Sequence, residues 1–327
     1  MRRFVVYGAG AIGGVIGARL FQHGHEVVLI ARGAHREAIA RDGLLLETMD
    51  GPYLAAVPVV GAPAEIDWRE DDVVFLTMKG QDTDAALDAL EATAPSSIAV
   101  ACAQNGVDNE RLALRRFANV YSIVVHLPAT HLEPGVVVAH SAPCTGSLDI
   151  GRFPPGVDEA AREIAAALAA STFSSDARAD ISRWKYAKLL RNLGNAVQAL
   201  FDPAVGAPEV SRRARAEAVT VLDAAGIEFT GDEEYDTRHA QLIRILDLPG
   251  HPHTGGSSWQ SLARGSGSIE TNQLNGEIVL LGALHGVATP VNALLQRLAV
   301  QAASEGRPPG SLSVEQLNEM AGLFRAE

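Results

Sequence analysis

The chain begins with a short apolar run that ends in closely spaced glycines, "FVVYGAGAIGG" at residues 4–14. Branched and aromatic residues that stop abruptly at glycine are typical of a buried parallel strand followed by a tight turn. Gly8, Gly10 and Gly13 have G-x-G-x-x-G spacing. The first glycine permits the sharp bend, the second lets a pyrophosphate approach the backbone, and the third lets the next helix pack closely on the strand.

The same segment has a second interpretation, because Arg2 and Arg3 precede a long apolar run, as in a secretory signal. The residues that follow favour the phosphate-binding turn. A helical pattern spans residues 11–23, Gly24 ends it, and residues 27–30 form a second buried strand. Strand, turn, helix and strand within about thirty residues make a complete βαβ unit. The residues of the turn that we expect to contact a dinucleotide are Gly8, Ala9, Gly10, Ala11, Ile12 and Gly13.

The end of the second strand indicates which dinucleotide is bound. Folds that bind NAD usually place Asp or Glu there, which accepts hydrogen bonds from the ribose 2′-hydroxyl. Here the strand ends in Arg32, with His35 and Arg36 close behind. A guanidinium can hold a 2′-phosphate with paired, charge-assisted hydrogen bonds. We therefore expect NADP as the cofactor; the alternative is that Arg32 is only a solvated residue before a helix.

Composition excludes several classes of protein. A formal net charge of -12 argues against a nucleic-acid groove or a polybasic membrane face. Cys102 and Cys144 are the only cysteines, which is too few for a disulfide framework and suits a reducing, cytoplasmic location. No later run reaches the eighteen or so uncharged apolar residues of a membrane span. The length of 327 residues allows two domains with sizeable cores.

Further apolar runs end in polar residues that are candidates for a site. The runs at 71–80 and 96–106 read "DDVVFLTMKG" and "SSIAVACAQNG", and another strand run follows at 119–129. Ligands of open α/β sheets lie beyond the carboxyl ends of the strands, so Lys79 and Asn105 are placed where a dinucleotide would bind. An Asn-Gly pair is also simply a good turn, and for Asn105 alone both interpretations stay open.

The character of the sequence changes near residue 178. Residues 1–178 predict a Rossmann-type α/β domain, and residues 179–327 predict an all-helical domain in which strand runs disappear. The fold class is therefore α/β with a helical second domain, and we expect a catalytic cleft between the two. Exposed faces of such helical domains often pair, so the sequence leaves a homodimer open.

Within the helical half, residues 182–197 form an amphipathic helix that carries Lys188 and Asn192. These two residues are four apart and share one face. A lysine that projects from a mostly apolar helix into a cleft can be desolvated, which lowers its pKa and suits it to give a proton near neutral pH. The alternative is that Lys185 and Lys188 are both ordinary exposed lysines.

The segment 267–286 is a second candidate. It predicts a carboxylate, Glu270, near the N-terminus of a long buried helix, where the helix dipole would stabilise its charge. Helix capping is the alternative for this residue, as it is for Ser257 and Ser258 at a loop-to-helix junction.

The histidines are weaker candidates. His251 and His253 have no carboxylate or cysteine in suitable company, so we expect a loop and no metal site. His126 and His131 border the exit of the strand run that follows Asn105, where they could approach a nicotinamide or simply be satisfied turn histidines.

Taken in order, these segments resemble the ketopantoate reductase (2-dehydropantoate 2-reductase) family over essentially the whole chain. The matching motifs are "GAGAIGG", "LTMKGQDT", "AQNGVDNE", "PGVVVAHS", "WKYAKLLRN", "GSSWQSLARGSGSIETNQLNG" and "HGVATPVN". The resemblance implies that NADPH delivers hydride to the carbonyl of a 2-oxo acid and that a lysine, here Lys188, gives a proton to the nascent alkoxide. It also implies that Lys79 and Arg32 help to hold the cofactor.

The resemblance assigns roles to four further residues. Asn105 would contact cofactor and substrate, and Asn192 and Ser258 would contact the substrate. Glu270 matches the glutamate of the family pattern E-x-D-x-x-N-G and is the second catalytic candidate.

Three departures from the family pattern bear on the substrate. The usual second asparagine falls on Ala196, the acid two residues after the glutamate is Asn272, and "HLPATH" at 126–131 is bulkier than usual. A pocket that loses a hydrogen-bonding group changes which substrate it accepts. Ketopantoate is the first-choice substrate; the alternatives are a paralogous reductase of another 2-oxo acid or ketone, and a protein that senses NADP without turnover.

Overall fold

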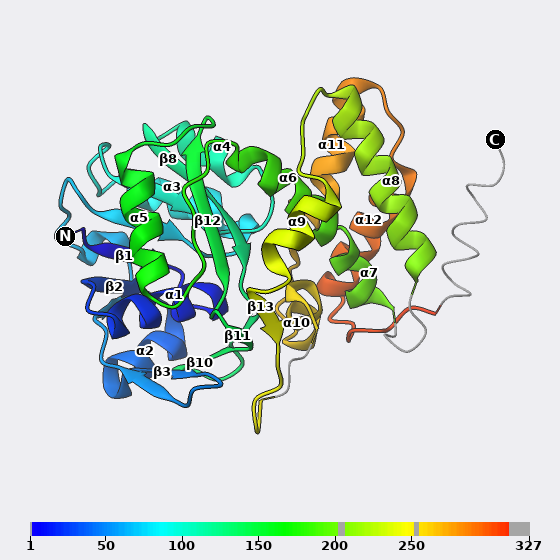
Figure 1. Ribbon diagram of the computed structural model, residues 1–327. Helices are drawn as coiled ribbons and strands as arrows, with labels where there is room; N and C mark the ends of the chain where they lie inside the picture. Colours follow the sequence, from blue (N-terminus) through cyan, green and yellow to red (C-terminus); the bar gives the residue numbers. More distant parts are fainter. Residues whose placement is uncertain (1, 202–206, 252–254, 314–327) are drawn as a thin grey trace. The chain divides into compact units, whose positions relative to one another are not determined.

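The computed structural model describes residues 2–201, 207–251 and 255–313 (Figure 1). The chain forms two compact units. The first contains the described residues of Met1–Lys185 and Thr230–His253, and the second contains those of Tyr186–Phe229 and Thr254–Glu327. The sequence predicts one boundary after residue 178; the structure differs in that a later segment returns to the first unit.

A seven-stranded sheet lies at the centre of the first unit. Its strand order is β12-β8-β7-β6-β1-β2-β5, and all neighbours are parallel except β12 and β8. The order reverses between β1 and β6, which is the switch point of a doubly wound fold. The predicted α/β fold class is confirmed. The strands are β1 (Phe4–Tyr7), β2 (Val27–Ile30), β5 (Val59–Val60), β6 (Val73–Leu76), β7 (Ala99–Cys102), β8 (Asn119–His126) and β12 (Ser147–Phe153).

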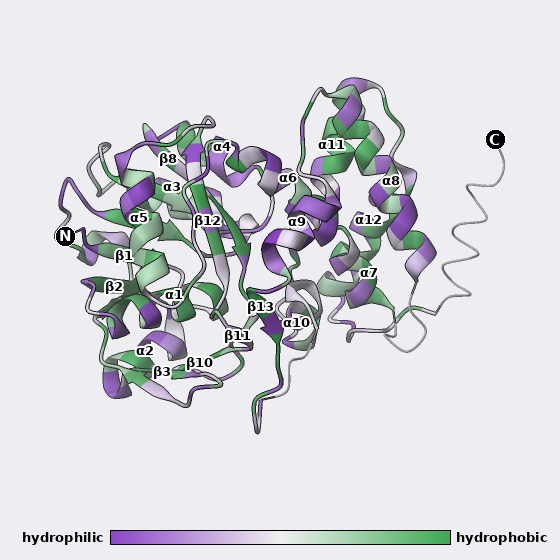
Figure 2. Ribbon diagram, in the orientation of Figure 1, coloured by the Kyte–Doolittle hydropathy of each residue, from purple (hydrophilic) through white to green (hydrophobic). Residues whose placement is uncertain are grey.

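Helices cover both faces of this sheet, which is why the central strands β1, β2, β6 and β7 are unbroken apolar runs (Figure 2). Val5 and Val6 of β1 are both fully buried but face opposite sides. Val6 belongs to the cluster that includes residues of α1 and α5, and Val5 to the cluster that includes residues of α3 and α4. The α-helices of the first unit are α1 (Ala11–Gln22), α2 (Gly33–Asp42), α3 (Thr83–Glu91), α4 (Asn109–Leu114), α5 (Glu159–Ala170) and α9 (Asp232–His239).

Two smaller sheets complete the first unit. One has the order β4-β3-β10-β9, and in the other β11 pairs antiparallel with β13. Since β13 lies in the half that the sequence predicts to be all-helical, that expectation is wrong for this segment. The short elements are β3 (Leu44–Glu47), β4 (Tyr53–Ala55), β9 (Ala129–Thr130), β10 (Val136–Ala139), β11 (Ser141–Pro143), β13 (Ile243–Ile245) and the 3-10 helices η1 (Pro63–Glu65) and η2 (Gly80–Asp82).

A buried carboxylate explains further why the segment 230–253 belongs to the first unit. Asp149 of β12 has a side chain that is only 3% exposed. Its oxygens accept hydrogen bonds from Arg178 Nε at 2.6 Å and from Arg238 Nη2 of α9 at 2.7 Å. Burial alone would raise the pKa of Asp149, but the hydrogen bonds and charges of the two arginines hold it below its usual value. The charge in β12 therefore binds α9 to the sheet.

The second unit is built from helices around one apolar core. That core includes Ala196, Leu200, Leu262 and Leu295. Nowhere in the described ranges does a helix combine the length and the apolar character that a membrane crossing needs. The helices are α6 (Ile181–Asn192), which starts in the first unit, α7 (Gly194–Leu200), α8 (Pro208–Ala224), α10 (Ser257–Ala263), η3 (Glu270–Asn272), α11 (Asn275–His285) and α12 (Pro290–Ser304).

Candidate active site

The glycine turn joins β1 to α1, and each of its glycines has a different environment. Gly8 has a φ of +105°, and a Cβ there would lie 2.9 Å from the backbone nitrogen of Met78. A Cβ at Gly13 would lie 2.3 Å from both the carbonyl oxygen of Gly8 and Thr77 Oγ1. By contrast, a Cβ at Gly10 would meet no atom within 4 Å. Gly8 and Gly13 are thus required by packing, whereas Gly10 borders open space.

That open space suits a phosphate group. Gly10 is the N-cap residue of α1, no side chain caps the helix, and its first turn holds no acidic residue. The unpaired N–H groups and the dipole at such a helix start attract anions. Ala9 is buried, and Ala11 and Ile12 at the helix start are half-buried. The predicted segment Gly8–Gly13 therefore fits the pyrophosphate of a dinucleotide.

His35 supports this turn from α2. Its Nδ1 accepts a hydrogen bond from the backbone N–H of Gly135 at 2.9 Å, so the proton is on Nε2, which lies 2.6 Å from the carbonyl oxygen of Ala9. Burial lowers the pKa of His35, and the charge of His131, whose ring centroid is 4.1 Å away, lowers it further. Neutral His35 thus links the glycine turn to the loop before β10. The sequence indicated only that His35 lies close to Arg32, and it did not indicate this structural role.

The cationic residues after β2 have different surroundings. Arg32 is exposed at the carboxyl end of the strand and is the N-cap residue of α2. Arg36 forms an ion pair with Glu65, with Nη2 3.1 Å from Oε2. Arg32 is therefore the more accessible of these two cations for a 2′-phosphate.

The strand ends that carry Lys79 and Asn105 are held by a buried polar network. Gln104 Nε2 donates to the carbonyl oxygen of Met78 at 2.9 Å and to Thr83 Oγ1 at 2.7 Å. The Thr83 hydroxyl in turn donates to Asn109 Oδ1 at 2.8 Å. Lys79 and Asn105 themselves are half-buried. Gln104 and Thr83 were not predicted from the sequence. Gln104 directly precedes Asn105, which was an available signal, whereas Thr83 lies four residues after Lys79 and has no such signal.

The remaining candidates lie in the second unit, on helices of its core. Lys188 is half-buried on α6, and burial together with the positive charge of Arg191 lowers its pKa from 10.5 to about 8. Asn192, one turn further on, is 5% exposed, and its Nδ2 has no hydrogen-bond partner among the described residues. The Ser258 hydroxyl, at the start of α10, is also buried and has no hydrogen-bond partner among the described residues. The helix α10 packs against α7. Buried donors without a protein partner are what a polar ligand would satisfy.

Glu270 is buried, but its setting differs from the expectation. The long helix α11 begins only at Asn275, and Glu270 lies on the preceding turn η3. The helix dipole acts within the first turn, and Glu270 lies four residues before Leu274, the N-cap residue of α11, so the expected stabilisation by that dipole is wrong.

The expectation that Lys185 is exposed is also wrong, because its side chain is only 5% exposed. The predicted residues divide between the units: the glycine turn, Arg32, Lys79 and Asn105 lie in the first, and Lys188, Asn192, Ser258 and Glu270 lie in the second.

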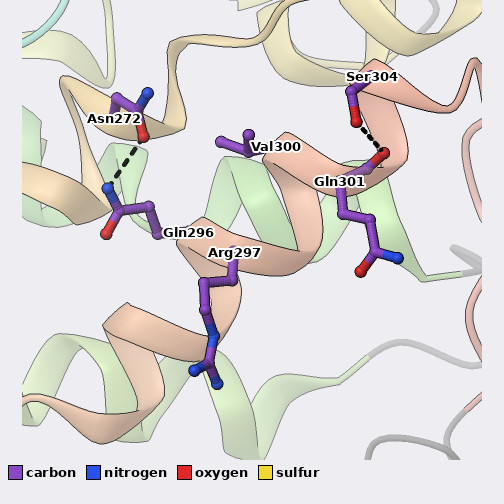
Figure 3. A pocket seen from close by; sticks show the side chains of 6 residues that line it. All are labelled: Asn272, Gln296, Arg297, Val300, Gln301 and Ser304. Atoms are coloured by element: carbon purple, nitrogen blue, oxygen red, sulfur yellow. Dashed lines mark hydrogen bonds between the residues drawn. The ribbon is translucent and has the colours of Figure 1, made fainter.

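Two of the departures from the family pattern have structural explanations. Ala196 is 1% exposed and fills the core of the second unit. Asn272 is exposed and accepts a hydrogen bond from Gln296 Nε2 at 2.9 Å (Figure 3). It borders a hollow of about 380 Å³ that none of the predicted catalytic residues lines. The lining residues are Asn272, Gln296, Arg297, Val300, Gln301 and Ser304.

The histidine candidates have packing roles. The ring of His126 lies 4.9 Å from that of His239, between centroids, and His239 stacks on Tyr235. His131 Nδ1 is 3.0 Å from the carbonyl oxygen of Val136. In the described ranges no cluster of histidine, cysteine or acidic side chains could hold a metal ion. His253 lies outside the described residues.

The fold and its glycine turn are those of a dinucleotide-binding protein, and the comparisons identify an oxidoreductase family. Residues 4–155 match the model "Ketopantoate reductase PanE/ApbA", and residues 180–303 match "Ketopantoate reductase PanE/ApbA C terminal". The chain belongs to the ketopantoate reductase family.

Relatives and solved structures agree with this assignment. The 2-dehydropantoate 2-reductase of Caulobacter vibrioides is 30% identical over 93% of this chain and 100% of its own length. The 2-dehydropantoate 2-reductase of Pyrococcus horikoshii is 27% identical over 90% of this chain and 96% of its own length. A crystal structure of a PanE/ApbA family ketopantoate reductase from Ralstonia eutropha JMP134 matches with a TM-score of 0.77 and 28% identity, over 93% of this chain and 99% of that one. The structure of D-mandelate dehydrogenase with NADH and anilino(oxo)acetate shares the fold, with a TM-score of 0.79 and 23% identity. The match covers 93% of this chain and 99% of that one.

Proposed function

We propose that this protein reduces a 2-oxo acid to a 2-hydroxy acid with NADPH, and that ketopantoate is its substrate. The observation that carries the proposal is Lys188, whose pKa of about 8 lets it hold a transferable proton near neutral pH. The family membership and the names of the curated relatives support ketopantoate. NADPH is supported by Arg32, because a cation at the end of β2 attracts a 2′-phosphate and an acidic residue would repel it.

The cofactor, when bound, supplies hydride to the carbonyl carbon of the substrate. Gly10 and the start of α1 would bind its pyrophosphate, Arg32 its 2′-phosphate, and Lys79 and Asn105 its nicotinamide half. As the carbonyl electron pair moves onto oxygen, Lys188 Nζ gives that oxygen its proton and is afterwards reprotonated by solvent. Asn192 and Ser258 would orient the substrate with the donors that have no protein partner. Glu270 is proposed to act at the same site.

The test is NADPH consumption by the purified protein with ketopantoate, with NADH and the Lys188→Ala variant in parallel. We expect turnover that prefers NADPH and that falls about 10²–10⁴-fold in the variant, which lacks the proton donor. Cofactor binding must persist in that variant, since the glycine turn is unchanged. Turnover by the variant at the wild-type rate would disprove the role of Lys188.

A second function is favoured by one observation. At position 196, where the family usually has asparagine, the chain has an alanine that packs into the core of the second unit, so this position offers a substrate no hydrogen-bonding group. A paralogous reductase would therefore accept another 2-oxo acid or ketone. A panel that contains ketopantoate and phenylglyoxylate, the 2-oxo acid that corresponds to mandelate, separates the two functions. Binding of NADPH with no turnover of any member would instead indicate a sensor of NADP.

We also propose that the protein is cytoplasmic and that it forms a homodimer. A cytoplasmic location is supported by Cys102 and Cys144, which are both free thiols. A homodimer is supported by Leu280 and Leu284, which are 50% and 68% exposed and lie one turn apart on α11. Light scattering during size-exclusion chromatography measures the assembly.

A further inference from the structure

Lys185 and Lys188 lie on the same helix, α6, but their surroundings differ. The side chain of Lys185 is 5% exposed and belongs to the first unit. Its Nζ lies 3.0 Å from Oε1 of Glu110, on the first turn of α4, and the Glu110 side chain is 2% exposed. This is a fully buried ion pair within one unit.

The ammonium group of Lys185 also links the segment that follows β7 to the strand β8. It donates to the carbonyl oxygen of Gln104 at 2.8 Å and to that of Ile123 in β8 at 3.3 Å. Hydrogen bonds from a charged donor are about twice as strong as neutral ones. Lys185 therefore fixes the peptide group that directly precedes Asn105 and connects it to the neighbouring strand.

The peptide group on the other side of Asn105 is held as well. Asn109 Nδ2 donates to the carbonyl oxygen of Asn105 at 3.1 Å, and Asn109 is itself fixed by Thr83 and is fully buried. Both peptide groups that flank the α-carbon of Asn105 are thus bound by buried side chains. The backbone of this residue is held more firmly than the turn alone would require.

Stability alone does not explain a buried pair of this kind. Removing two charges from water is costly, and packed apolar residues of similar size are often as stable or more stable. We propose that Lys185 and Glu110 are positioning residues, which act through the backbone to place Asn105 against cofactor and substrate. This inference rests on the role of Asn105 in the proposed function.

The experiment replaces the pair by apolar residues, in the double variant Glu110→Leu/Lys185→Met, so that no unpaired charge stays buried. A second buried pair provides the matched control. Arg3 and Asp72, with side chains 8% and 0% exposed and Nη2 2.6 Å from Oδ2, lie at the opposite, amino-terminal end of β1 and β6. The control variant is Arg3→Met/Asp72→Leu. Three quantities are measured: the NADPH dissociation constant, kcat with ketopantoate, and hydrogen–deuterium exchange of residues 103–109.

We expect the first double variant to lose about tenfold or more in kcat and to exchange faster at 103–109, because small misplacements of a substrate-binding group are costly. The control variant should stay within about twofold of wild type in kcat and in NADPH affinity. Turnover by the wild type tests the proposed function. Hydrogen–deuterium exchange and NADPH affinity, each compared between variant and wild type, test the role of the Lys185–Glu110 pair. Neither measurement depends on which substrate the protein reduces.

Two outcomes would overturn the inference. One is a folded Glu110→Leu/Lys185→Met protein with wild-type exchange and wild-type NADPH affinity. The other is an equal loss in the control variant, which would mean that any buried pair has this effect through stability. If the double variant does not fold, Lys185→Arg keeps the charge balance but moves the donors. We expect it to melt within a few degrees of wild type yet to lose several-fold in kcat, and unchanged kcat would overturn the inference.

Discussion

Alanine at Gly13 should lower the stability of the protein, whereas alanine at Gly10 should leave stability unchanged and weaken cofactor binding. The two glycines belong to the same turn and lie three residues apart. A Cβ at Gly13 would lie 2.3 Å from the Gly8 carbonyl oxygen and from Thr77 Oγ1, and 2.8 Å from a methyl of Val6. A Cβ at Gly10 would meet no atom of the protein within 4 Å.

The magnitudes follow from these contacts. Gly13→Ala gains about 1 kcal/mol of helix propensity but forces α1 away from β1, and overpacking typically costs about 1–3 kcal/mol or more. Because one of the contacts is a backbone atom that cannot move aside, overpacking should prevail, with a net loss of about 2 kcal/mol. This corresponds to a melting temperature about 4–8 °C lower. Gly10 has an extended backbone, with φ of −70°, so Gly10→Ala should melt within about 2 °C of wild type.

Cofactor binding should separate the variants further. The methyl group of Gly10→Ala occupies the space proposed for the pyrophosphate, so NADPH affinity should fall at least tenfold, which is about 1.4 kcal/mol. The assay combines calorimetric melting without ligand and NADPH titration by fluorescence at 20 °C. The reasoning is refuted if Gly10→Ala binds NADPH as wild type does, or if it melts as early as Gly13→Ala.

Three further predictions concern charged groups. In the proposed reaction Lys188 must carry the proton that it gives, so the rate of reduction should fall as pH rises through about 8, and Arg191→Ala should move this fall to higher pH; a flat pH profile between 7 and 9 would contradict this. Arg32→Ala should weaken NADPH about tenfold or more and leave NADH unchanged, as measured by parallel titrations; equal effects on both would exclude a 2′-phosphate contact. Asp149→Asn should cost about 3 kcal/mol at pH 7, because two arginines lose their buried partner. The folded pKa of Asp149 lies below its unfolded value, so its contribution is complete above about pH 4 and is lost as pH falls through the folded pKa. Urea unfolding at pH 7 and pH 3 should show the difference between variant and wild type shrinking at the lower pH.

The sequence was most informative where local pattern and tertiary environment agree. The strands β1, β2, β6 and β7 were predicted because both faces of the sheet are covered, which makes each an unbroken apolar run. Lys188 and Asn192 were correctly placed on one helix, since their spacing of four residues is a local property.

Features that depend on distant partners were not predictable in this way. Lys185 and Lys188 are the same residue type on the same helix, but Lys185 is buried against distant partners, the carboxylate of Glu110 and the carbonyl oxygens of Gln104 and Ile123. In the same way, the return of α9 to the first unit depends on Arg238 and the buried carboxylate of Asp149. The start of α11 at Asn275 is not marked in the sequence, because its N-cap residue is Leu274, whose side chain cannot cap a helix.

The contacts of His35 limit how the proposed preference for NADPH could be re-engineered. Exchanging the loop after β2 for that of an NAD-dependent enzyme is a natural design, since it replaces Arg32. The exchanged segment would also remove His35, whose ring joins the carbonyl of Ala9 to the amide of Gly135. Loop grafting would then weaken the glycine turn that both cofactors share. A successful graft keeps the imidazole and changes only the residues around it.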